Sequence, residues 1–323
     1  MEPLLGHVAY DDRTDEEHVA VNLAEASIPT LAMAGPVPML AKGESVRLFD
    51  FWSKPEVVAD VGFGFTRIHQ LTGSCVWAGG TNALFSSMAA QRLAADQPTK
   101  AFLPFTLHNY GASRRDLFRN TRKGEGSSGS TFAASLNRDG FTEWTNDGVN
   151  GIPRFTQPDG ITVTAGVEMD WSSVGVAHFN DAMKASVGHT VGSAARLRDV
   201  GDIRTAIVNG YGISFACDRF IGHGAVRGEG KLACVVGRWD SNGGHQQSIH
   251  AYWEHPEFGP LYWAQNNWGG NQYPADPAGG PACGVWVAEL DAQAALGYHA
   301  EVFAFSHLNW FPAQPRVLDW SQV

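Results

Sequence analysis

The sequence has few cysteines, and no two of them lie close together. Its 323 residues include only Cys75, Cys217, Cys234 and Cys283. Without a Cys-x-x-Cys pair, neither a zinc knuckle nor a thioredoxin-type redox motif is expected. Four cysteines allow two disulfides by number, but so low a density is typical of a reducing compartment. We therefore expect no metal, no cofactor and a cytoplasmic location.

The chain also lacks a long uninterrupted apolar run and an excess of basic residues. Its N-terminus shows no basic region followed by a long apolar stretch, so we expect no signal peptide. Ile28 to Ala41 is apolar, but three prolines interrupt it and exclude a membrane-spanning helix. The formal net charge of −10 argues against nonspecific nucleic-acid binding. We therefore expect neither nucleic acid nor a membrane among the partners.

A glycine-rich stretch, Gly124 to Ser130, invites comparison with a phosphate-binding loop. It has no Gly-Lys-Ser/Thr ending, and no apolar strand precedes it. Both are required of such a loop, so we reject that interpretation. The stretch leads instead into a predicted helix from Ser130 to Arg138, which Gly140 closes.

The remaining pattern predicts helices first and a sheet last. Further helices are expected from Asp15 to Ala26, from Cys75 to about Leu93, and after an Asp199 N-cap as far as Val208. Beyond that point the hydrophobic period changes to two, and glycine and proline mark the turns. The predicted strands are Ile213–Cys217, Lys231–Trp239, Gln247–Trp253, Leu261–Gln265, Val285–Leu290 and Val302–Ser306, with an isolated one at Ile161–Val167.

This order indicates an α+β fold with three segments. Residues 1–60 form an extended arm, residues 61–195 a helical lobe, and residues 196–323 a β lobe built as an antiparallel sheet or half-barrel. No internal repeat is visible. At this length the chain can bury a large core as one domain or two lobes.

The stretch from Gln70 to Gly80 carries the first chemical signal. Cys75 follows a Gly-Ser turn and falls in the first turn of a predicted helix. Unpaired N–H groups and the helix dipole favour an anion there, which lowers a thiol pKa and produces the nucleophilic thiolate. Gly79 and Gly80 are costly in a helix and indicate a close approach by another segment. The alternative is that Cys75 is a small buried hydrophobic residue.

A hairpin near the end of the chain supplies a candidate base. If its strands pair about a centre near Phe258, His250 lies opposite Asn266, and both side chains point to the same face. The carboxamide would then fix the imidazole and leave the other ring nitrogen for a thiol. A one-residue slip would separate the two side chains. A polar cross-strand pair is the alternative interpretation, and His245 and His255 are rival histidines.

Two short blocks resemble the papain-like cysteine peptidases. Gln70, Gly73-Ser-Cys75 and Trp77-Ala resemble the family's glutamine, Gly-Ser-Cys and Trp-Ala, while His250-Ala and Asn266-Asn-Trp-Gly269 resemble its His-Ala and Asn-Ser-Trp-Gly. The order Cys, His, Asn is also the family's order. Between the blocks, Gly126 to Gly129 resembles the family's Gly-Gly segment, whose backbone pairs with a bound peptide. The resemblance covers roughly residues 60–290 and is loose between the blocks.

The resemblance implies a role for each matched residue. Cys75 would be the nucleophile, His250 the general base and acid, and Asn266 the residue that orients His250. Gln70 and the Cys75 backbone N–H would form an oxyanion hole, and Trp268 would shield the His–Asn bond. The implied substrate-binding residues are Gly126, Ser127, Ser128, Gly129 and Trp268.

The first block departs from the family pattern. The spacing from Gln70 to Cys75 is one residue shorter than usual, and Val76 separates Cys75 from Trp77. Thr72 stands where the family has a disulfide cysteine, and Asn267 replaces the usual serine. The shortened spacing and the inserted valine bear on the oxyanion hole more than on the triad.

Three functions follow as hypotheses. The first is a papain-like thiol hydrolase, most specifically a peptidase that cleaves peptide or protein substrates through a Cys75 acyl-enzyme. The second is a structural or binding protein on the same scaffold, for example a component of a virus particle or another large assembly that it joins through residues 1–60. The third is a different Cys-His hydrolase, such as a cell-wall peptidase or an acyltransferase, which the Asn-x-Trp-Gly block disfavours.

The arm before residue 60 bears on activation. Secreted papain relatives carry a prodomain that fills the cleft backwards, but no prodomain motif is apparent here. Pro29, Pro36 and Pro38 favour an extended conformation, and Met33 and Leu40 would be costly to leave in water. We therefore expect the arm to pack on the body of the protein, or on a neighbouring subunit, and to leave the cleft open.

Overall fold

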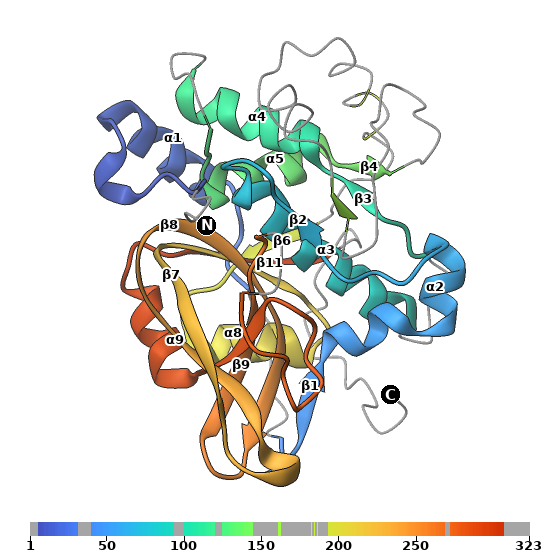
Figure 1. Ribbon diagram of the computed structural model, residues 1–323. Coiled ribbons are helices and arrows are strands. Elements are labelled where there is room, and N and C mark those ends of the chain that lie inside the picture. Colours follow the sequence, from blue (N-terminus) through green and yellow to red (C-terminus); the bar gives the residue numbers. More distant parts are fainter. Residues whose placement is uncertain are drawn as a thin grey trace.

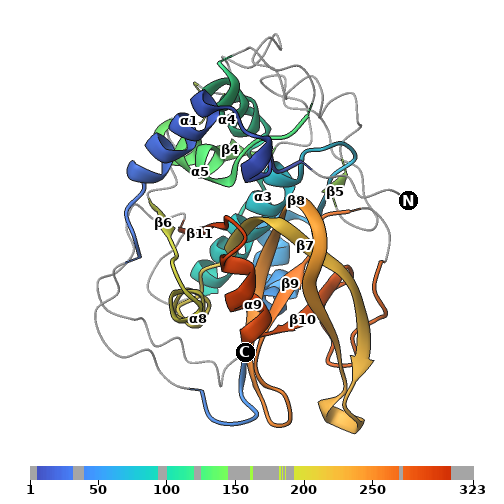
Figure 2. The same ribbon diagram turned by 90° about the vertical axis from the view of Figure 1, so that its left-hand side faces the viewer.

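The computed structural model describes residues 6–31, 40–93, 100–119, 125–144, 161–162, 182, 184, 186, 193–268 and 272–306, and every structural statement below refers to these residues. Helices α1, α4 and α5 lie together at one end of the molecule and a curved sheet lies at the other, with helix α3 between them (Figures 1 and 2). This is the predicted α+β architecture, with a helical lobe packed against a β lobe.

Helices α1, α3, α5 and α8 of the described residues fall close to their predicted positions. The described helices are α1 (Asp15–Ala26), α2 (Pro55–Val61), α3 (Cys75–Leu93), α4 (Leu107–Phe118), α5 (Gly129–Asp139), α8 (Val200–Val208) and α9 (Glu289–Leu296), with 3-10 turns at Tyr10–Asp12, Leu48–Ser53 and Gly230–Leu232. The sequence analysis did not predict α2, α4 or α9, and it assigned the first two residues of α9, Glu289 and Leu290, to the end of a strand.

Polar side chains begin three of these helices. Thr14 and Glu17 form a reciprocal capping box at the start of α1, with Thr14 accepting from the Glu17 amide and Glu17 from the Thr14 amide. The Ser128 hydroxyl accepts from the Thr131 amide in α5, and the Asp199 carboxylate accepts from the Asp202 amide in α8. Each cap satisfies a donor that the helix cannot pair internally. The Asp199 cap was predicted from the sequence.

Helix α3 is the centre of the molecule. Every residue from Cys75 to Gln91 is buried, so the helix is covered on all sides and not on one apolar face alone. Its two glycines allow the close approach that the sequence indicated. A Cβ atom on Gly80 would lie 2.3 Å from the Phe132 ring of α5, and one on Gly79 would lie 3.0 Å from the Asn267 carboxamide. The helix therefore contacts both lobes directly.

The sheet of the β lobe contains seven strands. Its order is β10-β9-β8-β7-β11-β6, and β1 pairs with β8. The strands are β1 (Ser45–Arg47), β6 (Ser193–Arg196), β7 (Ile213–Arg227), β8 (Cys234–His255), β9 (Gly259–Gln265), β10 (Gly284–Ala288) and β11 (Glu301–Ser306). Strand β10 pairs with both β9 and β8, so the sheet folds back on itself as a half-barrel.

Two sequence expectations about strands need correction. The separate strands predicted at Lys231–Trp239 and Gln247–Trp253 are one long strand, β8, which pairs with an equally continuous β7 through several bulges. We interpreted the glycines between these two segments as a turn, but they lie within β8, whose pairing with β7 contains bulges. Of the predicted Ile161–Val167 strand, β5 (Ile161–Thr162) is present, and the rest lies outside the described residues.

Two short two-stranded sheets complete the helical lobe. Strand β2 (Ile68–His69) pairs with β5, and β3 (Pro104–Phe105) pairs with β4 (Thr142–Glu143).

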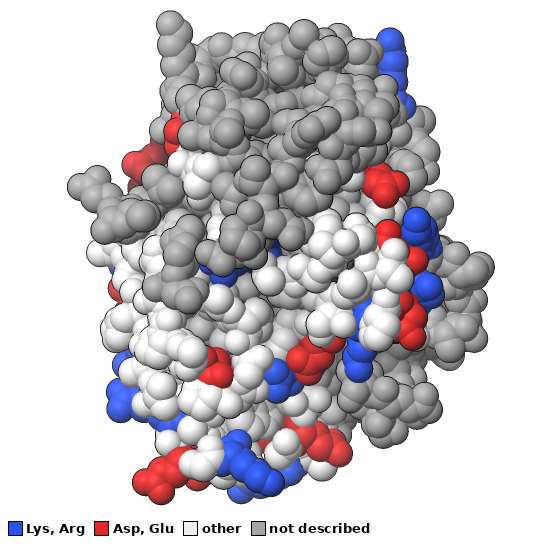
Figure 3. All heavy atoms as spheres, turned by 45° about the vertical axis from the view of Figure 1, so that its right-hand side comes forward, with Lys and Arg blue, Asp and Glu red and all other residues white. Residues whose placement is uncertain are grey.

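On the face shown in Figure 3, acidic and basic side chains are intermixed at the lower end and along one edge. Among the described residues, no helix is long and apolar enough to cross a membrane.

Candidate active site

Cys75 lies at the position that the sequence predicted, at the first residue of α3. The loop before it is fixed by the helical lobe. The Tyr110 hydroxyl donates to the Gly73 carbonyl at 3.1 Å, and the Glu125 carboxylate accepts from the Gly73 amide. The Cys75 side chain is therefore held in a fixed place at the start of the helix.

The Cys75 thiol faces strand β8 of the other lobe. Its Sγ atom accepts a hydrogen bond from the Gln246 backbone amide at 3.3 Å. The Asn267 carboxamide reinforces this junction by donating to the Gln246 carbonyl at 2.8 Å and to the Cys75 carbonyl at 3.4 Å. Its oxygen accepts from the Asn82 side chain of α3 at 3.1 Å. The thiol therefore lies at the junction of the two lobes.

His245, the residue before Gln246, is the histidine at this junction. Its Nε2 lies 2.9 Å from the Asn266 Oδ1, and the Trp268 indole stacks on its ring at 4.8 Å between centroids. Because the same oxygen also accepts from the Asn267 amide, it is the acceptor, and Nε2 carries the hydrogen. The neutral ring then has its lone pair on Nδ1. That atom is buried and has no hydrogen-bond partner among the described residues.

The predicted pairing of His250 with Asn266 is wrong. His250 Nδ1 lies 2.8 Å from the Ser86 hydroxyl of α3, and the Trp52 indole packs edge-on against its ring at 5.1 Å. Ser86 is eleven residues after Cys75, which corresponds to roughly 16 Å along the helix axis. The structure therefore brings His245, and not His250, to Asn266.

The register of the hairpin explains this difference. Tyr252 pairs with Tyr262, so the hairpin is centred on Glu257 and not near Phe258, and every partner on β9 lies two residues earlier than the sequence count assumed. A bulge at His250 then shifts the remaining pairs by one more residue. Asn266 lies beyond the end of β9, and its side chain contacts His245. The sequence count misplaced the centre of the hairpin and therefore selected the wrong histidine.

Gln70 lies at the same junction, although its side chain is engaged within its own loop. Its backbone amide donates to the Asn267 carbonyl at 2.9 Å, and its side-chain Nε2 donates to the Thr72 carbonyl at 3.0 Å. An isolated bridge pairs Gln70 with Trp268. Its role as an oxyanion donor stays a prediction.

The cleft is occupied by the chain's own N-terminal residues 6–8, which we call the cover segment. The Gly6 carbonyl accepts from the Ser127 amide at 2.8 Å, and the Val8 amide donates to the Ser127 carbonyl at 2.9 Å, so the segment runs parallel to this edge. On the other side, the His7 amide lies 3.3 Å from the Gly244 carbonyl. Ser127, within the stretch predicted to bind peptide, therefore pairs with the chain's own N-terminal residues, and binding of a substrate peptide there stays a prediction.

The packing of the cover segment leaves no room for larger residues. A Cβ atom on Gly6 would lie 1.8 Å from the Gly73 carbonyl oxygen, and one on Gly244 would lie 2.1 Å from the His7 carbonyl oxygen. Contacts below 3.0 Å cannot be accommodated without movement of the backbone. The expectation that the arm leaves the cleft open is therefore wrong. Only its attachment to the body is confirmed, since residues 29–31 pair with Arg196 and Ile28 and Leu31 are buried.

Burial under the cover segment changes the titration of the site. It raises the pKa of the Cys75 thiol to about 12, although backbone N–H groups of Gln246, Gly6 and His7 oppose the rise. Burial also lowers the pKa of His245 to about 4. In this state both groups are neutral at pH 7, in contrast to the lowered thiol pKa that the helix start alone predicted.

No group of three or more histidine, cysteine, aspartate or glutamate side chains in the described part of the chain could hold a metal ion. Cys75, Cys217, Cys234 and Cys283 are all buried, and none of them is joined in a disulfide bond.

Sequence reasoning missed three contributors to this site. His245 was considered only as a rival, although the Gly243-Gly244 pair before it marks a place where another backbone approaches. Asn267 was noted only as a departure from the family pattern. Nothing in the sequence around Gly6 indicated the cover segment, because a single glycine near a chain end is common.

Comparison with solved structures places this geometry in a known fold. Xylellain, a cysteine protease from Xylella fastidiosa, is 14% identical, with a TM-score of 0.54 over 94% of this chain and 96% of that one. Digestive procathepsin L 3 from Tenebrio molitor larval midgut is 11% identical, with a TM-score of 0.47 over 91% of this chain and 79% of that one. Bromelain from Ananas comosus is also 11% identical, with a TM-score of 0.45 over 83% of this chain and 99% of that one. No protein-family model matches the sequence, and no curated protein does. On the strength of the first likeness, the chain has the fold of the papain-like cysteine proteases.

Proposed function

We propose that the protein is a thiol hydrolase, specifically a cysteine peptidase, and that its described form is latent. One observation carries the proposal. The Cys75 thiol at the start of a buried helix bonds to the residue next to His245, whose other ring nitrogen is held by Asn266. A nucleophile, a base and a residue that orients the base are the minimum set for nucleophilic catalysis.

In the proposed reaction, Nδ1 of His245 takes the Cys75 proton, and the thiolate attacks the carbonyl carbon of a peptide bond. In this proposal the resulting oxyanion accepts from the Cys75 backbone N–H and from the Gln70 side chain, whose Nε2 in the described form donates to the Thr72 carbonyl. His245 then gives the proton to the leaving amine, and the acyl group stays on Cys75 until water hydrolyses it. Asn266 holds the imidazole plane throughout, and Trp268 covers the His–Asn bond.

The cover segment suits a latent state and is a poor substrate. The backbone N–H groups of Gly6 and His7 lie close enough to the sulfur to oppose the rise of its pKa. Attack requires a carbonyl carbon at that place, so the segment occupies the cleft without presenting a bond for cleavage. Departure of the segment would expose Cys75 and His245 to water. Exposure removes the burial that keeps both groups neutral and so favours the thiolate–imidazolium pair.

A single substitution in the full-length chain tests the proposal. Gly6→Ala places a Cβ atom against the Gly73 carbonyl and should expel the cover segment. Gly64→Ala is the matched control, since nothing lies within 4 Å of its Cβ position. We expect a thiol-directed epoxide peptide to label Gly6→Ala at least about tenfold faster than either the parent or the control. Peptide mapping should place the label on Cys75, and Cys75→Ala should abolish both labelling and peptide turnover.

Other results would reject the proposal. If Gly6→Ala melts as cooperatively as the control and yet neither labels at Cys75 nor cleaves peptides, the chain is not a peptidase. The remaining hypothesis would then be a binding protein on a papain-like scaffold, for which a covered and unreactive thiol is expected. Labelling at Cys217, Cys234 or Cys283 in preference to Cys75 would also contradict the assigned nucleophile.

A further inference from the structure

Asn267 follows the asparagine that holds His245, and its side chain lies between the two lobes. It is 0% exposed, and its carboxamide nitrogen donates to the Gln246 carbonyl at 2.8 Å and to the Cys75 carbonyl at 3.4 Å. One of these carbonyls belongs to the residue that carries the candidate nucleophile, and the other belongs to the residue after the candidate base. A single side chain therefore joins the main chains of both.

The carboxamide of Asn267 is itself held in one orientation. Its oxygen accepts from the Asn82 side chain of α3 at 3.1 Å, and the oxygen of Asn82 accepts from the Ile68 amide at 2.6 Å. Asn82 is also fully buried. Since the nitrogen of Asn267 donates twice and its oxygen accepts, rotation of the carboxamide would break every one of these bonds in a dry environment.

The backbone of Asn267 contacts a third part of the candidate site. Its carbonyl accepts from the Gln70 amide at 2.9 Å, and its amide donates to the Asn266 Oδ1 at 2.7 Å, the same oxygen that holds His245. Asn267 thus contacts the segments that carry the candidate nucleophile, base and oxyanion donor.

Helix α3 is shaped to admit this side chain. A Cβ atom on Gly79 would lie 3.0 Å from the Asn267 Nδ2 and 3.2 Å from the Gln246 carbonyl oxygen, so a larger residue would push against both. The papain-like pattern has a serine at the position of Asn267. A serine hydroxyl carries one hydrogen and could donate to only one of the two carbonyls, whereas the carboxamide donates to both.

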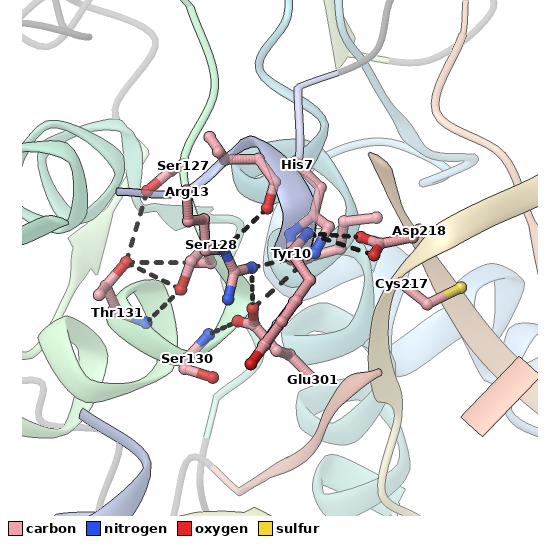
Figure 4. A network of polar contacts seen from close by, with 12 residues as sticks. His7, Tyr10, Arg13, Ser127, Ser128, Ser130, Thr131, Cys217, Asp218 and Glu301 are labelled. Carbon is pink, nitrogen blue, oxygen red and sulfur yellow. Dashed lines mark hydrogen bonds and ion pairs between the residues drawn. The ribbon is translucent and has the colours of Figure 1, made fainter. Parts of the chain in front are cut away.

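The contacts that anchor the N-terminal arm are separate from those of Asn267. Arg13 forms an ion pair with the Glu301 carboxylate, and the Asp218 carboxylate accepts from the Tyr10 amide at 3.1 Å (Figure 4). The hydrogen bonds of Asn267 given above all lead to the body of the protein. We therefore expect them to remain after the cover segment leaves.

We propose that Asn267 is a positioning residue, which sets the distance between the Cys75 thiol and the His245 imidazole by tying together the main chains beside them. This inference rests on the proposed function. Proton transfer and attack both depend on that distance, and a displacement of about 1 Å can lower a rate by about 10²-fold.

The test replaces Asn267 with leucine, which has the same branched shape and no polar group, in the full-length Gly6→Ala chain. We expect kcat for a fluorogenic peptide to fall about 30-fold while KM changes less than about threefold, because Asn267 contacts the main chain behind the reacting groups. Asn267→Ser keeps one donor, should lower kcat about tenfold, and decides the question if the leucine variant does not fold. A folded variant whose kcat stays within about twofold of the active Gly6→Ala chain overturns the inference.

Gln91→Met is the matched control for a purely structural effect. Gln91 lies near the other end of α3 and is buried, and its side chain donates to the Ser306 hydroxyl of β11 at 2.9 Å. The control therefore also removes a buried hydrogen bond between α3 and the β lobe. Both variants should lower the melting temperature by a few degrees, but Gln91→Met should keep kcat within about twofold. Equal losses of kcat would show that Asn267 is only structural.

Amide exchange separates this inference from the proposed function. The Gln246 amide donates to the Cys75 sulfur, and its exchange with deuterated water reports opening of the junction without any turnover. Asn267→Leu should raise this exchange rate at least about tenfold, and Gln91→Met no more than about twofold. If no variant turns over any peptide but this difference is observed, the peptidase proposal fails and the tie made by Asn267 stands. If Asn267→Leu raises the rate no more than Gln91→Met does, the inference is rejected whatever the turnover.

Discussion

Two histidines on one strand, His245 and His250, have almost the same immediate surroundings. Both lie on β8 and are buried, and burial lowers both pKa values, to about 4 and about 3. Each has one ring nitrogen close to a side-chain oxygen and an indole packed against its ring. Burial, titration and hydrogen bonding therefore do not distinguish a candidate base from a structural histidine.

Position relative to the thiol makes the difference. His245 precedes the residue whose amide contacts the Cys75 sulfur, whereas His250 bonds to Ser86, three turns further along α3. The first lies where the two lobes meet, and the second lies in the core beside Trp52. A perturbed pKa by itself is thus a weak indicator of function, and geometry must come first.

The sharpest test of this comparison is to remove each histidine in the Gly6→Ala chain. His245→Ala should lower kcat by about 10³-fold, since a positioned base contributes 10²–10⁴-fold. His250→Gln keeps a polar group near Ser86 and should change kcat less than about threefold. Steady-state kinetics with a fluorogenic peptide measures both, and melting curves confirm that both variants are folded. Equal losses would show that the distinction between the two histidines is wrong.

Acid should release the cover segment through His7. Burial, with a further lowering by Arg13 and an opposing effect of Glu301, holds the pKa of docked His7 at about 4, while a released His7 returns toward 6.5. The released state therefore binds more protons between those values, and docking weakens as the pH falls through this window. The release equilibrium should increase about 50-fold between pH 7 and 4.5.

The readout for this effect is the rate of Cys75 labelling in the full-length chain, divided at each pH by the rate in Gly6→Ala. The division cancels the intrinsic pH dependence of the thiol. His7→Gln cannot take up this proton, so its ratio should rise clearly less in acid than that of the parent. The rise that remains is assigned to His245, whose pKa of about 4 under the cover segment also increases on release. A parent ratio that does not rise in acid contradicts the prediction.

Asn266→Ala should have a smaller effect than loss of His245. It removes the bond to His245 Nε2 but leaves the imidazole in place under Trp268. One hydrogen bond of about 1–1.5 kcal/mol corresponds to a loss in kcat of roughly tenfold in the Gly6→Ala chain. Kinetics with the same peptide measures it. A loss as large as that of His245→Ala would mean that Asn266 does more than orient the ring.

The smallest change in kcat is expected for a substitution next to His250. Ser86→Ala removes the partner of His250 Nδ1 and of the Trp52 indole N–H, both of which are buried. Thermal or denaturant unfolding should show a loss of about 1–3 kcal/mol, while kcat of the Gly6→Ala chain stays within twofold. A large kinetic loss without loss of stability would place His250 in the catalytic site after all.

Local patterns in the sequence were sufficient for most helices. The N-caps at Thr14 and Asp199, the glycine after Asp139 and the thiol at the start of α3 depend on residues close in the chain. Hydrogen bonds across three or four residues determine these features, and they do not depend on the rest of the fold. The candidate thiol Cys75 and the asparagine Asn266 could also be selected from two short sequence blocks.

The tertiary structure alone decided which histidine meets Asn266 and what fills the cleft. The hairpin is centred one residue earlier than the sequence count assumed, and a bulge at His250 shifts the ladder once more, so the two side chains expected to pair do not face each other. The seating of Gly6 against Gly73 and the pairing of Arg13 with Glu301 join residues far apart in the sequence. Such contacts cannot be predicted from neighbouring residues in the sequence. Their stabilisation comes from burial and charge pairing, which arise only when the two lobes pack together.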